Sequence, residues 1–222
     1  MQILFIGKKN DANAHVASAY LQQIFPNTKV VFGVREEKFP EDLMHWKGDY
    51  IFSYLSPWII PNSLLESAEK GAINWHPGPP EYPGIGCTNF ALYNNEKDFG
   101  ITCHYMLAKV DTGKIIEVRR FKILENDSVY SITKKCYSLI LNSFYSIIEK
   151  ISSGEPLLVS VDDWTRKPFT RKELDSLCEI TPDMPKDEIE RRIRATTYDK
   201  PWAFVEIKGN IFYYQDQESL RN

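Results

Sequence analysis

Residues 2–25, QILFIGKKNDANAHVASAYLQQIF, decide the class of fold. The segment begins with a short apolar run over residues 2–6 that stops at Gly7, which is typical of a strand. Ala14, Ala17 and Leu21 then recur at helical spacing. The segment therefore predicts a strand followed at once by a helix.

The same alternation continues along the chain. Strand-like runs occupy 28–34, 49–55 and 72–75, and helical segments at 40–46 and 61–71 lie between them. Strands that alternate with helices over short connections predict an α/β fold, with a mostly parallel sheet and helices on both faces. Ligands of such sheets bind beyond the carboxyl ends of the strands, where the strand order reverses.

The pattern changes after this region. Residues 88–95 predict one or two helical turns, and 100–107 and 114–123 predict two strands joined by a loop. From Asp127, apolar residues recur every three or four positions as far as Gly154, which predicts a long helix that covers the sheet.

The C-terminal part predicts a small extension of helices and a hairpin. Helices are expected over 171–178 and 184–198, and WAFVEIKGNIFYY (202–214) alternates around Lys-Gly-Asn as a β-hairpin does. An isolated hairpin is marginal in water, so we expect it to pack on the body or on another subunit. We divide the chain into a catalytic domain, 1–155, and an extension, 156–222.

Composition limits the possible partners. The 222 residues are 43% hydrophobic, enough for one substantial core, and the net charge of −3 offers no basic field for nucleic acid. The opening MQILFIGKK lacks a secretory leader, and no run approaches a membrane span, so we expect a cytoplasmic protein without a membrane partner. The cysteines are far apart and predict buried reduced thiols: Cys87, Cys103, Cys136 and Cys178.

Two kinds of site receive little support. The loop GKKNDANAH lacks both the dinucleotide and the NTP glycine patterns, although Lys8, Lys9 and Asn10 could meet an anion at a helix start. The four histidines show no paired metal-ligand spacing, and we expect no metal site.

Asn74, His76 and Asp111 form the strongest chemical group. Asn74 and His76 are two residues apart at a strand end, so their side chains point the same way if the strand reaches His76. Asp111 precedes Gly113, which allows a sharp turn. An amide donor, an imidazole and a carboxylate without a Ser or Cys nucleophile suit acyl transfer to an amine, although a rim or core role for His76 is also open.

Two segments carry a resemblance: NWHPGPPEYPGIG (74–86) and GITCHYMLAKVDTGKII (100–116). Together they closely resemble the paired signature of the folate-dependent formyltransferases. The matching positions are Asn74, His76, Pro77, His104, Asp111, Gly113 and Ile115. The resemblance covers residues 1–125 well and implies a Rossmann-like core.

The resemblance also implies a reaction and a set of binding residues. It implies transfer of formyl from N10-formyltetrahydrofolate to an amine, with Asn74, His76 and Asp111 as the catalytic set. Folate binding is implied for Trp58, Ile59, Ile60, Met106, Lys109 and Val110.

The proline-rich stretch 77–84 is similar to that of enzymes that formylate nucleotide-linked amino sugars for bacterial surface polysaccharide. On this basis Lys9, Gly78, Tyr82, Gly84 and Asn89 are assigned to the sugar nucleotide. The C-terminal IRATTYDKPWAFVEIKGNIFYY (193–214) is similar to the terminal extension of the sugar formyltransferases, which implies a homodimer formed through the hairpin. The alternatives are glycinamide ribonucleotide formylation, a formyl-folate hydrolase, and a folate-binding protein without transferase activity.

Overall fold

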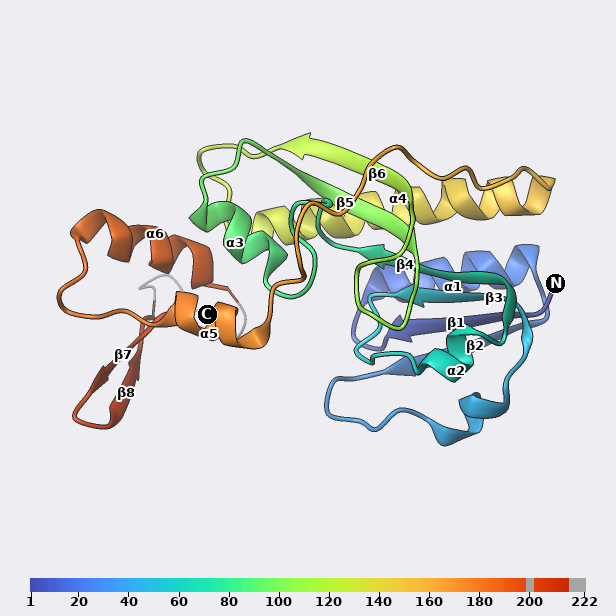
Figure 1. Cartoon of the computed structure of the whole chain (residues 1–222), viewed down its shortest axis with the longest axis horizontal. Helices are drawn as coiled ribbons and strands as arrows, with labels where there is room; N and C mark the ends of the chain where they lie inside the picture. Colours follow the sequence, from blue (N-terminus) through green and yellow to red (C-terminus); the bar gives the residue numbers. More distant parts are fainter. Residues whose placement is uncertain (199–201, 216–222) are drawn as a thin grey trace.

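β1 lies between the edge strand β2 and β3 in a six-stranded sheet in this computed structural model, which describes residues 1–198 and 202–215 (Figure 1). The strand order is β2-β1-β3-β4-β5-β6, parallel from β2 to β4 and antiparallel from β4 to β6. The strands are β1 (Ile3–Lys8), β2 (Thr28–Gly33), β3 (Gly48–Tyr54), β4 (Ala68–His76), β5 (Asp98–Tyr105), β6 (Ile115–Lys122), β7 (Phe204–Ile207) and β8 (Asn210–Tyr213). This confirms the predicted α/β class.

Helices cover both faces of the sheet. They are α1 (Ala12–Ile24), the 3-10 helix η1 (Glu41–His45), α2 (Asn62–Leu65), α3 (Cys87–Tyr93), α4 (Val129–Ser153), α5 (Arg171–Cys178) and α6 (Lys186–Thr196). Residues of α1 and α4 pack on one face, and residues of η1 and α2 pack on the other. Ten residues of the predicted extension, 199–201 and 216–222, lie outside the described chain.

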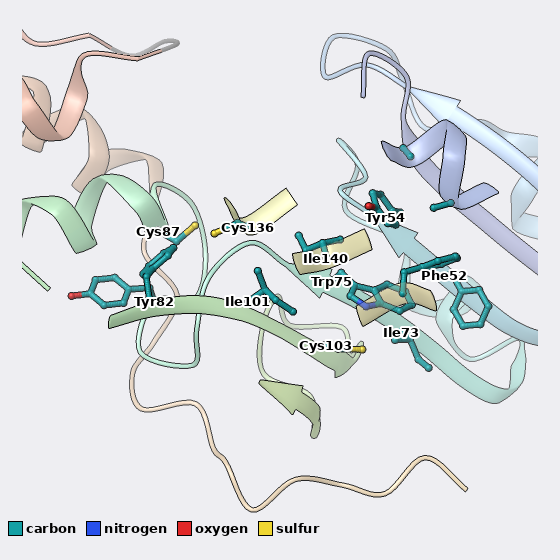
Figure 2. Packing of buried hydrophobic residues seen from close by; sticks show 14 of the residues in the cluster. Phe52, Tyr54, Ile73, Trp75, Tyr82, Cys87, Ile101, Cys103, Cys136 and Ile140 are labelled. Carbon is teal, nitrogen blue, oxygen red and sulfur yellow. The ribbon is translucent and has the colours of Figure 1, made fainter. Parts of the chain in front are cut away.

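Alternation along the strands builds the two apolar layers. Ile3 and Phe5 of β1 face the α1 and α4 layer, whereas Leu4 and Ile6 face the η1 and α2 layer. Figure 2 shows Phe52, Tyr54 and Trp75 side by side in the first layer, and the Phe144 ring of α4 lies 5.0 Å from the Trp75 ring. All four cysteines are buried, as the sequence predicted.

One sequence expectation was wrong in detail. The helix expected over 61–71 is limited to Asn62–Leu65, because β4 already pairs with β3 at Ala68. Pairing with a neighbouring strand outweighs the local helical preference of this segment. Asn74 and His76 lie at the carboxyl end of β4, where parallel pairing with β3 gives way to antiparallel pairing with β5. The strand order itself reverses one strand away, between β1 and β3.

The predicted hairpin is present as β7 and β8. Lys208 and Gly209 both have positive φ angles, 50° and 78°, as a two-residue turn of type I′ requires. The base of the hairpin is attached to the segment after α5, because the Ile180 N–H donates to the Phe204 carbonyl at 2.7 Å. In Figure 1 the hairpin, α5 and α6 lie at the end of the molecule away from β1 and β2.

Candidate active site

The end of β4 and the adjacent β5 bring three polar side chains together. β4 extends to His76, so Asn74 and His76 lie on one face of the strand, while Trp75 packs in the core on the other. β5 runs antiparallel to β4 and places His104 directly opposite Asn74 in the register. The Asn74 amide nitrogen lies 3.1 Å from His104 Nε2.

Asp111 reaches this group from the loop between β5 and β6. Its backbone has a φ of 46°, in the left-handed region where a residue with a side chain is uncommon. Gly113 makes the turn possible, because a Cβ atom there would lie 1.7 Å from the Tyr105 carbonyl oxygen. The Gly84 N–H donates to Asp111 Oδ2 at 2.8 Å and helps hold the carboxylate.

The Asp111 carboxylate lies between two imidazoles. His76 Nδ1 is 3.3 Å from Asp111 Oδ2, and His104 Nε2 is 3.3 Å from Asp111 Oδ1. All three side chains are at most 5% exposed. A buried carboxylate is costly unless it is paired, and both of its oxygens are paired here.

Backbone carbonyls occupy the remaining ring nitrogens. His104 Nδ1 lies 2.8 Å from the Tyr105 carbonyl, and Nε2 faces both the Asn74 amide and Asp111 Oδ1. A neutral ring with its proton on Nδ1 accepts from Asn74 at Nε2, whereas a doubly protonated ring donates from Nε2 to Asp111. The second amide hydrogen of Asn74 remains for a ligand, and Asn74 is only half-buried. His76 Nε2 lies 2.8 Å from the Tyr82 carbonyl, so the proline-rich loop closes on this imidazole.

The charges of the group lower the pKa of Asp111. Burial alone would raise the pKa of its carboxyl, but the attraction of His76, together with hydrogen bonds from His104 and Gly84, lowers it to about 2. The folded-state pKa is thus below the ordinary value of about 4. The resulting stabilisation is present above about pH 4 and is lost as the pH falls toward 2.

The residues expected to bind folate lie in two loops beside this group. Trp58, Ile60 and Met106 pack around the second apolar layer, and the Trp58 indole donates to the Glu37 carbonyl at 2.7 Å. The indole also fills the space above Gly33, so its ring packs against the backbone of that residue. Ile59, Lys109 and Val110 are exposed.

The residues assigned to the sugar nucleotide do not form one surface. Tyr82 is 5% exposed, and its hydroxyl donates to Glu96 at 2.7 Å, so its side chain belongs to the core. The Asn89 amide donates to the Ala195 carbonyl at 2.7 Å and thereby attaches α3 to α6. Lys9 is exposed, and its ammonium lies 3.9 Å from the Glu37 carboxylate.

Gly78 and Gly84 instead lie against His76 and Asp111. A Cβ atom on Gly78 would lie 2.7 Å from His76 Nε2, so only glycine lets the loop approach this imidazole. Gly84 contributes the N–H that holds Asp111. Both glycines therefore support His76 and Asp111 in this structure.

Two residues escaped assignment from the sequence. His104 was noted as a motif match without a role, and only the register between β4 and β5 reveals that it joins Asn74 to Asp111. Trp164 contacts both imidazoles, with ring centroids 5.9 Å from His76 and 5.0 Å from His104. No sequence signal indicated that residue 164 returns to this site.

A hollow of about 370 Å³ lies elsewhere, between α6 and the ends of α3 and β6. It contains none of Asn74, His76, His104 and Asp111. Its lining mixes both signs of charge: Leu92, Asn95, Glu96, Lys97, Ile123, Leu124, Glu125 and Arg194. Within residues 1–198 and 202–215, no cluster of three or more His, Cys, Asp or Glu side chains is arranged to hold a metal ion. None of the helices in that same part of the chain is long and apolar enough to cross a membrane.

An amide donor and a carboxylate–imidazole group at the carboxyl end of a central strand define an enzyme of acyl transfer, and comparison with known proteins identifies the kind. The family model described as "Formyl transferase" matches residues 7–144. The chain belongs to the formyl transferase family and is an N-formyltransferase.

Individual relatives agree with this assignment. The chain is 27% identical over 188 residues to the GDP-perosamine N-formyltransferase of Brucella melitensis, covering 84% of this chain and 71% of the relative. Its fold is similar to that of a sugar N-formyltransferase from a Shewanella species, with a TM-score of 0.78 at 16% identity over 97% and 96% of the two chains. An N-formyltransferase from Helicobacter canadensis, solved with folinic acid and dTDP-3-aminofucose, gives a TM-score of 0.71 at 20% identity over 94% and 85%.

The origin of the low Asp111 pKa can be tested by removing one imidazole. In a His76→Gln variant the largest attraction is lost while burial remains, so we expect the pKa of Asp111 to rise from about 2 to the ordinary value of about 4 or higher. Carboxyl ¹³C NMR titration measures this value. His45→Gln, on exposed η1, is the control that leaves it unchanged. An Asp111 pKa that stays near 2 in His76→Gln contradicts the assignment.

Proposed function

We propose that this N-formyltransferase transfers the formyl group of N10-formyltetrahydrofolate to the amine of a nucleotide-linked amino sugar. The observation that carries the reaction is the Asn74 amide, fixed by His104 beside the buried Asp111 carboxylate. The relative from Brucella melitensis is a GDP-perosamine N-formyltransferase, and the fold is shared with a protein solved with dTDP-3-aminofucose. These relatives support a dTDP- or GDP-linked amino-dideoxysugar as acceptor, and a place in bacterial surface polysaccharide (O-antigen) synthesis is part of the same proposal.

The two loops beside the site fit a folate donor. The Met106 N–H donates to the Ala72 carbonyl at 2.7 Å, so the loop after β5 begins two residues from Asn74 along β4. Apolar side chains on the loops project to the surface, with Ile59 76%, Leu107 58% and Val110 44% exposed. Exposed apolar groups around a polar site suit a flat ring system such as a pterin. When bound, formyl-folate supplies an electrophilic formyl carbon and a nitrogen leaving group.

Asn74 stabilises the charge that develops during the transfer. One hydrogen of its amide is held by His104 Nε2, and the other can donate to the formyl oxygen as that oxygen becomes negative. The amide cannot rotate freely while His104 is itself held by the Tyr105 carbonyl. A donor that is oriented in advance costs little reorganisation at the moment of reaction.

The His76–Asp111 pair handles the proton. The attacking amine must lose a proton as its nitrogen bonds to the formyl carbon, and the folate nitrogen must gain one as it leaves. For His76 to accept the first proton, its Nε2 must exchange the Tyr82 carbonyl, 2.8 Å away, for the amine, while Asp111, 3.3 Å from Nδ1, stabilises the charged imidazole. The His104 imidazole lies beside the other oxygen of the Asp111 carboxylate.

The role of Asn74 can be measured directly. We expect Asn74→Ala to lower kcat/KM by about 10²- to 10³-fold, because a donor to the reacting oxygen is removed. The assay follows formylation of an amino-sugar nucleotide, and circular dichroism checks that the fold is intact. Asn142→Ala, on the exposed side of α4, is the matched control with wild-type activity. Near-normal turnover by Asn74→Ala would rule out this mechanism.

We also propose that the hairpin joins two copies of this chain. Apolar side chains on β7 and β8 are largely exposed: Ile207 is 51%, Ile211 52%, Phe212 55% and Tyr213 55% exposed. A two-stranded hairpin is marginally stable unless it is packed, and a symmetric pair of hairpins would bury the face that carries Ile207 and Phe212.

Light scattering tests the dimer. The wild-type protein should have twice the 25.8 kDa mass of one chain, and Phe212→Asp should have the mass of one chain because it buries a charge in the interface. Leu158→Asp, at a side chain that is 75% exposed outside the hairpin, should remain a dimer. A wild-type monomer at micromolar concentration contradicts the proposal.

A further inference from the structure

Trp164 lies in the segment that returns from the end of α4 across the catalytic group. This segment, 155–170, is outside the 7–144 region that the family model matches. It crosses β6 and the proline-rich loop before α5 begins at Arg171 (Figure 1). The family match therefore assigns nothing to it.

The indole of Trp164 contacts both imidazoles that flank Asp111. It is perpendicular to His104, at 89° with a centroid distance of 5.0 Å, and tilted 69° to His76 at 5.9 Å. The imidazoles are almost fully buried, whereas Trp164 itself is only half-buried. The indole is thus a cover between the two imidazoles and solvent.

Trp164 also holds the turn that carries Asp111. Its indole N–H donates to the Gly113 carbonyl at 2.8 Å, two residues after Asp111. A hydrogen bond at this position restrains the left-handed backbone at Asp111, which has a φ of 46°.

The segment around Trp164 is attached on both sides. The Ser160 N–H donates to the Ile115 carbonyl at 2.8 Å, and the Thr165 N–H donates to the Pro80 carbonyl at 3.3 Å. The Phe169 N–H donates to the Pro83 carbonyl at 2.9 Å, and the Phe169 ring stacks on Phe90 with a centroid distance of 3.8 Å. These contacts fix the backbone of the segment, and with it the indole.

We propose that Trp164 is a positioning residue that orients His76, His104 and the Asp111 turn for formyl transfer and keeps water from the reacting centre. The inference rests on the proposed function, because the reacting centre is that of the formyl donor. Formyl transfer competes with hydrolysis wherever water can enter. In hydrolysis the water oxygen bonds to the formyl carbon, the carbon–nitrogen bond to folate breaks, and the nitrogen takes a proton, which yields formate and tetrahydrofolate.

Two variants separate the contacts of Trp164. Trp164→Ala removes both the cover and the hydrogen bond to Gly113, and we expect kcat to fall about 100-fold while KM for both substrates stays close to wild type. Formate released per formylated sugar should rise about tenfold or more, because water enters the site. Trp164→Phe keeps a ring against the imidazoles, so we expect kcat to fall only about tenfold with little extra formate.

Trp46→Phe is the matched control. Trp46 follows η1, near the amino end of β3 and opposite the catalytic end of the sheet, so this variant should retain wild-type kcat and formate release. Unchanged kcat and formate release in Trp164→Ala overturn the proposal. A raised KM for the sugar nucleotide with unchanged kcat also overturns it, since Trp164 would then bind substrate.

The test distinguishes this inference from the proposed function. If wild-type protein formylates none of the amino-sugar nucleotides, the proposed acceptor is wrong, and the role of Trp164 is read from formate release alone. In that case an increase in formate release by Trp164→Ala but not by Trp164→Phe still supports the inference, and no difference between the variants and wild type contradicts it.

Discussion

A buried carboxylate between two imidazoles is the interaction on which the rest of the site depends. Each oxygen of Asp111 has its own imidazole at 3.3 Å, and Gly84 adds a backbone N–H at 2.8 Å. Without these partners the charge could not remain buried, since desolvation of an unpaired carboxylate costs several kcal/mol. These contacts hold the side chain of Asp111 from several directions and so maintain the left-handed conformation of its backbone.

The strand pairing changes from parallel to antiparallel at β4, next to the Asp111 carboxylate and its two imidazoles. The parallel part brings Asn74 and His76 to a carboxyl end, as in other open α/β sheets, but His104 must approach from the opposite direction along β5. Antiparallel pairing sets His104 opposite Asn74, and the loop that follows β5 then returns Asp111 to both histidines. The proline-rich loop closes the group through the Tyr82 carbonyl and the Gly84 N–H.

Much of this could be predicted from sequence, because it depends on local patterns. Short apolar runs predicted the strands, and apolar residues that recur every three or four positions predicted the long helix. The spacing of Asn74 and His76 predicted their common face. The role of His104 depends on a register between strands about 30 residues apart, which no local pattern encodes. The loop residue Tyr82 looked like a ligand contact, but its side chain fills the core and its carbonyl meets His76.

Transfer of a labelled formyl group is the most direct test of the central claim that this site formylates an amino sugar. The wild-type protein would be incubated with N10-formyltetrahydrofolate labelled with ¹³C in the formyl group. The acceptors would be dTDP- and GDP-linked 3-amino and 4-amino sugars, with glycinamide ribonucleotide as a competing acceptor, and mass spectrometry would read the products. The account predicts that one amino-sugar nucleotide gains a single labelled formyl group while glycinamide ribonucleotide gains none. Label found only on glycinamide ribonucleotide, or only in formate, would contradict it.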